Sequence, residues 1–208
     1  MDDNRSEIVV FDFDGTLTTR DSFLVFIRYA RGTHSYWRGM LECLPQIILY
    51  GLHLISNETL KQHVFGKFFS GMPYEDFCEK AREFSLSCID GFARKETVEI
   101  LHEYVAVGHK VLIVSASVPE WIQPWASRHG VSKVLGTEIE VSEQGTLTGR
   151  LSTKNCYGAE KVRRFLEECP YRSSYKLTVY GDSRGDRELM SLADESFLIA
   201  PPGARSIR

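Results

Sequence analysis

The chain has 208 residues, of which 43% are hydrophobic, so it is long and apolar enough to bury a substantial core and is not a disordered chain. Its 25 basic and 28 acidic residues give a formal net charge of -3, which argues against a polybasic protein that binds nucleic acid. The five cysteines form no C-x-x-C pair, which favours reduced thiols over disulfides or structural zinc. No apolar run reaches the roughly 20 residues of a membrane-spanning helix. Because residues 1–7 are polar and lack the features of a signal peptide, we expect a cytoplasmic protein.

The first distinctive stretch is the apolar run from Ile8 to Phe13, which predicts a buried parallel strand. The run contains Asp12 and is followed at once by Asp14 and Gly15, and a glycine lets the chain turn sharply. Because side chains alternate along a strand, we expect both carboxylates to face the same point. Two anions this close repel each other, and a bound cation would relieve the repulsion.

Helical patterns follow this strand. Asp21 is a plausible N-cap for a helix that ends near Gly32. We expect one or two apolar helices over residues 37–55, broken near Pro45 or Gly51. The pattern predicts another helix over residues 57–69 and a longer helical region from 73 to 108.

The second half of the chain alternates strands with helices, which predicts an α/β fold with a doubly wound, mostly parallel sheet. We expect strands at 111–114, 177–180 and 196–200, helices at 119–129, 158–169 and 188–193, and an antiparallel hairpin at 137–141 and 146–151.

Polar side chains stand at the ends of three of these strands, and parallel strands end at a shared edge of the sheet. The groups are Asp12 with Asp14, Ser115 with Ser117, and Asp182 with Asp186. Aspartate oxygens are hard ligands that favour magnesium over zinc, and magnesium commonly holds a phosphate. Serine hydroxyls, backbone amides and Lys161 would complete a phosphate cradle.

In this order, these segments resemble the four motifs of the haloacid dehalogenase superfamily: Asp12-Phe13-Asp14-Gly15-Thr16, Ser115, Lys161, and Gly181-Asp182 with Asp186. The resemblance spans nearly the whole chain. The helical insertion after the first motif resembles the cap of the phosphoserine-phosphatase-like branch (subfamily IB, with a C1-type cap). It implies a Rossmann-like core at 1–18 and 91–208 and a helical cap at 19–90.

The resemblance also implies the chemistry, that of a Mg²⁺-dependent phosphatase. Asp12 would be the nucleophile that forms an aspartyl-phosphate, and Asp14 the acid-base partner. The metal site would comprise Asp12, the Asp14 backbone carbonyl, Asp182 and Asp186, with Asp186 orienting Lys161 or a metal-bound water. Asp21 would bind the amine of the substrate or serve only as a helix cap. The expected substrate-binding residues are Gly15, Thr16, Asp21, Ser115, Ala116, Ser117 and Lys161.

The substrate stays open at this stage. Phosphoserine phosphatases usually have glycines after the motif serine, where this chain has Ala116 and Ser117, and an asparagine at the position of Gly185. The same site could also serve a phosphotransferase or a non-catalytic phosphate-binding module. The oligomeric state is open as well.

The apolar residues at 37–55 have two interpretations. Either the helices bury them against each other, or the cap rests on the inner face of a membrane or takes a lipid-like phosphate. The lipid interpretation is kept because small bacterial relatives of this branch resemble phosphatidylglycerophosphate phosphatases. Arg28, Arg31 and Arg38 border the stretch and could meet anionic headgroups.

Overall fold

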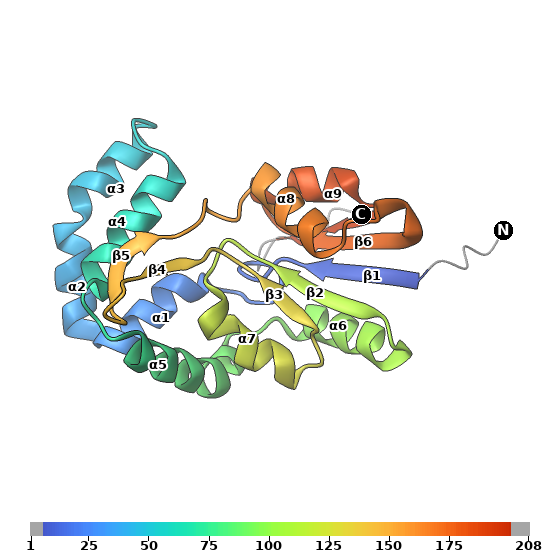
Figure 1. Cartoon of the computed structure of the whole chain (residues 1–208), viewed down its shortest axis with the longest axis horizontal. Helices are drawn as coiled ribbons and strands as arrows, with labels where there is room; N and C mark the ends of the chain where they lie inside the picture. The colour runs from blue at the N-terminus through green and yellow to red at the C-terminus, as the bar shows by residue number, and fades with distance from the viewer. Residues whose placement is uncertain (1–5, 201–208) are drawn as a thin grey trace.

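The computed structural model describes residues 6–200, and its centre is a five-stranded parallel sheet with the strand order β3-β2-β1-β6-β7 (Figure 1). The first strand of the chain pairs with both β2 and β6, so it lies in the middle of the sheet. The predicted α/β fold with a mostly parallel sheet is therefore confirmed. The strands are β1 (Ser6–Phe11), β2 (Lys110–Val114), β3 (Lys133–Leu135), β6 (Tyr175–Gly181) and β7 (Glu195–Leu198).

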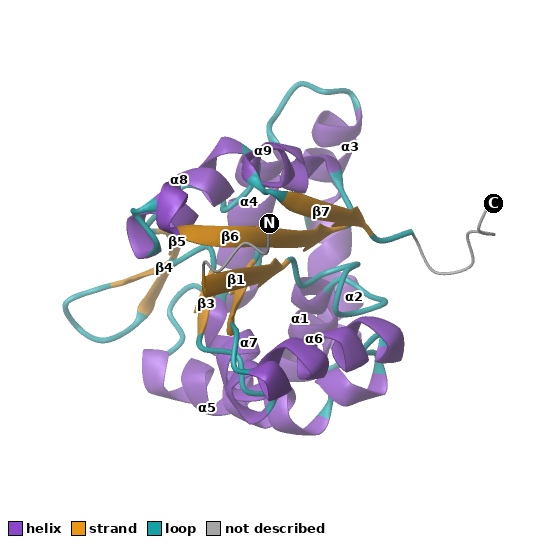
Figure 2. Ribbon diagram, turned by 90° about the vertical axis from the view of Figure 1, so that its right-hand side faces the viewer, coloured by secondary structure: helices purple, strands orange, loops and turns teal. Residues whose placement is uncertain are grey.

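Helices cover both faces of the sheet because the central strand is apolar on both sides (Figure 2). Val9 and Phe11 pack into one cluster with Trp121, whereas Val10 packs into a second cluster with Phe165. The first face carries α6 (Lys95–Val107) and α7 (Pro119–Arg128), and the second carries α8 (Ala159–Glu168) and α9 (Arg187–Leu192).

The first five α-helices after β1 gather beyond the carboxyl ends of the strands (Figure 1). The hairpin lies against α4 (Asn57–Phe69), and just after this helix the Gly71 N–H donates to the Leu147 carbonyl at 2.8 Å. The division into a core and a cap at 19–90 stays a prediction, although the helices occupy that part of the chain. They are α1 (Ser22–Arg31), α2 (Thr33–Glu42), α3 (Leu44–Gly51), α4 (Asn57–Phe69) and α5 (Tyr74–Ser87), and the hairpin strands are β4 (Ile139–Val141) and β5 (Leu147–Leu151).

Two sequence-based expectations differ from the structure, and one of the two interpretations of residues 37–55 does not hold. The first strand ends at Phe11, so Asp12 and Asp14 lie in the following turn, and the alternation rule for strands does not apply to them. The short strand β3 was not predicted. The apolar stretch 37–55 breaks at Cys43, and none of its large apolar side chains is buried, so these helices do not bury that face against each other.

Other features agree with the sequence. All five cysteines are free thiols. Within residues 6–200, no helix combines the length and the hydropathy needed to cross a membrane. Residues 1–5, which carry most of the argument about a signal peptide, lie outside the described part of the chain.

Candidate active site

A cavity of about 560 Å³ lies between the carboxyl ends of the strands and the helices beyond them. Its core side is polar and contains six of the sequence-predicted residues with side chains that carry chemistry: Asp12, Asp14, Ser115, Ser117, Lys161 and Asp182. Its other side is mostly apolar and comes from the helices: Phe23, Leu24, Met40, Ile47, Leu60 and Val64. The sequence-predicted strand ends thus meet in one place.

Lys161 is buried between two carboxylates. Its Nζ donates to Asp12 Oδ1 at 2.5 Å, to Asp186 Oδ1 at 2.6 Å and to the Val114 carbonyl at 2.8 Å. Burial alone would lower the pKa of Lys161, but the charges of Asp12 and Asp186 outweigh it and hold that pKa above its usual range. The lysine is therefore a permanent cation beside Asp12.

Burial raises the pKa of Asp12 to about 8, although Lys161 opposes the shift. Burial would also raise the pKa of Asp186, but Lys161 outweighs it and holds that pKa below its usual range. The second oxygen of Asp186 accepts from the Asp182 and Ser183 N–H groups and from the Ser183 hydroxyl. Both oxygens of Asp186 are thus engaged, an arrangement suited to holding Lys161 in place.

Three carboxylates form a cluster that could hold a metal ion. Asp12, Asp182 and Asp186 each offer an oxygen within 4.8 Å of the others. Asp182 Oδ1 is buried and has no hydrogen-bond partner among the described residues, and burial raises the pKa of this carboxyl. An all-oxygen donor set with an unpaired buried oxygen fits Mg²⁺, the metal that the sequence predicts.

Asp14 points away from this cluster. Its Oδ1 accepts from the Ser22 N–H at 2.6 Å and its Oδ2 from the Ser117 hydroxyl at 2.5 Å. Burial, followed by the charge of Asp21, raises the pKa of Asp14 to about 6 despite these two hydrogen bonds. A carboxyl with such a pKa can both give and take a proton near neutral pH.

The loop Ser115-Ala116-Ser117 follows β2 and faces the cavity. The Ser117 N–H donates to Ser115 Oγ at 3.0 Å, which leaves the Ser115 hydroxyl hydrogen available to a ligand. The Ala116 carbonyl accepts from Lys61 at 2.7 Å and from Thr137 at 2.6 Å, so it is fixed from outside the loop.

Gly15 and Thr16 lie beside the cavity but do not line it. Gly15 has φ +89°, and a Cβ there would collide with the Asp182 carboxylate, so the expected need for glycine at this turn is met. Thr16 is fully buried, and its carbonyl accepts from Thr97 at 2.8 Å. Asp21 lines the cavity and also caps α1, because its Oδ1 accepts from the Leu24 N–H at 3.1 Å.

Sequence reasoning missed several residues that the fold brings to the site. Lys61 of α4 reaches Ala116 and is 3.4 Å from Asn155 Oδ1, and burial lowers the pKa of this lysine. Arg94 donates to the Gly15 carbonyl at 2.8 Å. A lysine in a helical pattern or an arginine before a helix carries no signal of its own, since only the tertiary placement brings each to the strand ends.

Comparison with known proteins adds independent findings. A family model described as haloacid dehalogenase-like hydrolase matches residues 9–191. Protein CicA of Caulobacter vibrioides (strain NA1000 / CB15N) is 33% identical over 190 residues, which cover 90% of this chain and 83% of that protein.

Two solved structures share the fold. A protein of unknown function from Bordetella pertussis Tohama I has a TM-score of 0.78 at 20% identity, over 96% of this chain and 93% of that one. A phosphoserine phosphatase solved as a phospho-aspartyl intermediate analogue has a TM-score of 0.64 at 16% identity, over 96% of this chain and 89% of that one.

Proposed function

Because the chain belongs to the haloacid dehalogenase-like hydrolase family, we propose that it is a phosphatase that hydrolyses a phosphate monoester through an aspartyl-phosphate on Asp12. The observation that carries the proposal is the buried Lys161, held between Asp12 and Asp186 at the floor of the cavity. The solved phospho-aspartyl analogue of a phosphoserine phosphatase, which shares this fold, supports the same chemistry.

The chain's own residues divide the work. Asp12 attacks phosphorus, so a bond forms between its oxygen and phosphorus while the bond to the leaving oxygen breaks. Lys161 offsets the negative charge of the phosphoryl group, and Ser115 donates a hydrogen bond to it. Asp14 gives a proton to the leaving oxygen and then takes one from the water that attacks the aspartyl-phosphate. The water oxygen bonds to phosphorus as the bond between phosphorus and the Asp12 oxygen breaks, which releases phosphate and restores Asp12.

Asp12 and Asp182 would hold Mg²⁺, together with the Asp14 backbone carbonyl, and Asp186 would support the site through Lys161. When bound, Mg²⁺ supplies positive charge that lets an anionic nucleophile approach an anionic phosphate. The buried, unpaired Asp182 oxygen supports this assignment.

Hydrolysis of 4-nitrophenyl phosphate, with and without Mg²⁺, tests the proposal. We expect turnover that requires the metal and that falls by at least about 10³-fold in Asp12→Asn, which keeps the shape but removes the nucleophile. Turnover without metal, or a fully active Asp12→Asn variant, would contradict the mechanism. Product analysis with added alcohols separates hydrolysis from phosphotransfer, and an inactive wild-type chain that still binds phosphate would indicate a non-catalytic module.

A second observation favours an amphiphilic phosphate as the substrate. Met40 and Ile47 line the cavity, whereas the outward side of the same two helices exposes large apolar side chains. The apolar cap face comprises Trp37, Leu41, Leu44 and Ile48 on these helices together with Leu52 and Leu54 just after α3, and these side chains are 44–69% exposed. We propose that this face rests on a membrane surface and that the apolar group of a lipid-like phosphate occupies the cavity wall.

Co-sedimentation with anionic and zwitterionic vesicles tests this second proposal. We expect binding to anionic vesicles, because the exposed residues Arg28, Arg31 and Arg38 lie in the apolar stretch 37–55 or just before it in the sequence. The double variant Leu41→Ser/Ile48→Ser should lose binding, whereas Val107→Ser, which changes an exposed apolar residue on α6, should keep it. Wild-type chain that stays in the supernatant with anionic vesicles would end the membrane proposal and leave the phosphatase proposal untouched.

A further inference from the structure

The orientation of Asp14 depends on two donors from different parts of the chain. The Ser22 N–H belongs to the first residue of α1, and the Ser117 hydroxyl belongs to the loop after β2. Each donor takes one carboxylate oxygen, so the plane of the carboxylate is fixed on both sides. If Asp14 is the group that gives a proton to the leaving oxygen, these donors decide where that proton is presented.

The Ser117 hydroxyl is itself the end of a buried hydrogen-bond chain. The Trp121 indole N–H donates to Ser22 Oγ at 3.1 Å, Ser22 Oγ donates to Ser117 Oγ at 3.4 Å, and Ser117 Oγ donates to Asp14 Oδ2 at 2.5 Å. An indole can only donate, and each hydroxyl has a single hydrogen, so the direction of the chain is set from Trp121 toward Asp14. Ser22, Ser117 and Trp121 are at most 2% exposed, which shields the chain from competing water.

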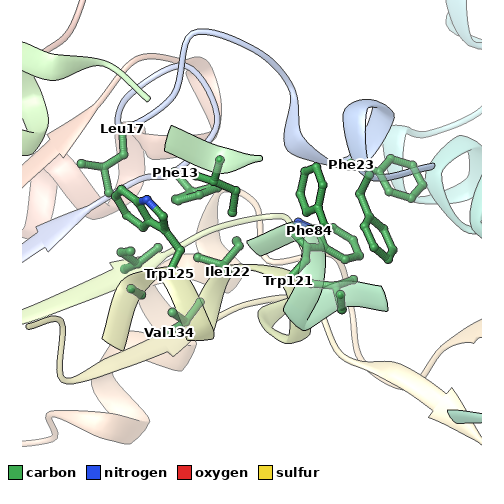
Figure 3. Packing of buried hydrophobic residues seen from close by; sticks show 14 of the residues in the cluster. Phe13, Leu17, Phe23, Phe84, Trp121, Ile122, Trp125 and Val134 are labelled. Carbon is green, nitrogen blue, oxygen red and sulfur yellow. The ribbon is translucent and has the colours of Figure 1, made fainter. Parts of the chain in front are cut away.

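Aromatic packing holds the start of this chain in place. Trp121 stacks on Phe26 with ring centroids 4.9 Å apart and on Phe23 at 6.0 Å. Phe84 lies beside them, and all of these rings belong to one buried cluster (Figure 3). Phe23 and Phe26 lie on α1, which also contains Ser22. The stacking therefore holds α1 against Trp121, whose indole N–H orients the Ser22 hydroxyl.

We propose that Ser117, Ser22 and Trp121 are positioning residues that aim Asp14 at the leaving oxygen, and that Ser117 does not serve as a phosphate ligand. The inference rests on the proposed phosphatase function. It reverses the sequence-based expectation for Ser117, whose only hydroxyl hydrogen is given to Asp14. Ser115, whose hydroxyl accepts from the Ser117 N–H, keeps its hydrogen for the phosphoryl group.

The test compares two esters of similar size that differ in their need for a proton. Phenoxide is a poor leaving group that needs protonation, whereas 4-nitrophenoxide leaves without it. We therefore expect Ser117→Ala to lower kcat/KM for phenyl phosphate by about 10- to 100-fold and for 4-nitrophenyl phosphate by less than about threefold. The difference arises because kcat/KM reports the transfer of the phosphoryl group to Asp12, the step in which Asp14 acts only as an acid. The loss should fall mainly on kcat rather than KM.

Companion variants separate positioning from structural damage. Ser117→Thr keeps the hydroxyl and should restore the ratio between the two esters, while Ser22→Ala and Trp121→Phe should change it in the same direction by a few fold. Trp125→Phe is the matched control, because it removes the indole N–H that Trp125 gives to Asp90 from the same helix without touching the chain to Asp14. Thermal unfolding of each variant shows whether it is folded.

Equal losses on both esters in Ser117→Ala would overturn the inference and return Ser117 to the phosphate site. If that variant fails to fold, the ratios in Ser22→Ala and Trp121→Phe decide, and an unchanged ratio in both overturns the inference as well. A wild-type chain inactive on both esters with Mg²⁺ would instead overturn the phosphatase proposal and this role with it.

Discussion

Replacing Lys161 by Met should destabilise the fold severely as well as abolish turnover. Lys161 is 2% exposed and is the cation between Asp12 and Asp186, which are also buried. Methionine fills a similar volume but leaves two carboxylates close together without a counter-charge. Breaking a buried ion pair from one side typically costs about 3–5 kcal/mol, a large part of a total stability of about 5–15 kcal/mol.

For a chain of this size, each kcal/mol shifts the midpoint of thermal unfolding by about 2–4 °C, so we expect a decrease of about 6–20 °C at pH 7. Lys133→Met is the control: Lys133 also forms an ion pair, with Glu168 at 2.7 Å, but its side chain is 53% exposed. That surface pair should contribute at most about 1 kcal/mol.

The stability of the wild type and that of Lys161→Met should change in opposite directions on acidification. In the wild type, Lys161 holds the pKa of Asp186 below its usual value, so this carboxyl stabilises the fold above pH 3.8 and loses that contribution as the pH falls further. In Lys161→Met the cation is gone and burial raises the pKa of both carboxyls, so acidification from pH 7 to 5 should recover stability. Differential scanning calorimetry at both pH values measures this, and a loss below about 1 kcal/mol at pH 7 would refute the reasoning.

Three further predictions concern the turn, the metal and the helix cap. Gly15→Ala should abolish Mg²⁺-dependent turnover, because the Cβ of the new alanine meets the Asp182 carboxylate. The control is Gly145→Ala, at a glycine with φ +74° and open space around it; this variant should lose only about 1–2 kcal/mol of unfolding free energy and keep its activity. The affinity for Mg²⁺ should weaken from pH 8 to pH 6, because burial raises the pKa values of Asp12 and Asp182 and protons then compete with the metal. Calorimetric titration measures this affinity, and an affinity that does not change with pH would contradict the prediction. Asp21→Ala should lose about 1 kcal/mol of stability, because it removes the cap of α1, whereas Asp21→Asn keeps an oxygen that can cap the helix and should lose almost none. A loss of turnover in Asp21→Asn would therefore indicate that the Asp21 carboxylate acts on the substrate in the cavity.

The core and its motifs could be predicted from sequence because they depend on local patterns. An apolar run that ends in acids, as at Ile8 to Asp14, predicts both a central strand and its chemistry, and α4 begins and ends where its pattern indicates, at Asn57 and Phe69. A strand of three residues such as Lys133–Leu135 is too short to show a period.

Other features depend on tertiary contacts that no local pattern carries. The contact from Lys61 to the Ala116 carbonyl joins residues 55 apart in the chain. The exposure of Leu41 and Ile48 depends on whether another element covers them, and in the described structure none does. The role of Ser117 is of the same kind, because its hydroxyl meets Asp14 across 103 residues.

The central position of β1 has a consequence for how the protein is made. Asp12 leaves the ribosome before its counter-ion Lys161, which follows 149 residues later, and β6, which pairs with one edge of β1, follows Lys161. Until then the Asp12 carboxylate has no cation to pair with when it is buried, and the central strand lacks one of its neighbours. The helices encoded in between can pack on one another first, so synthesis delivers the part that covers the site before the site itself exists. Because contacts this distant in sequence form slowly, we expect the final closure of the sheet to be the slow step of folding.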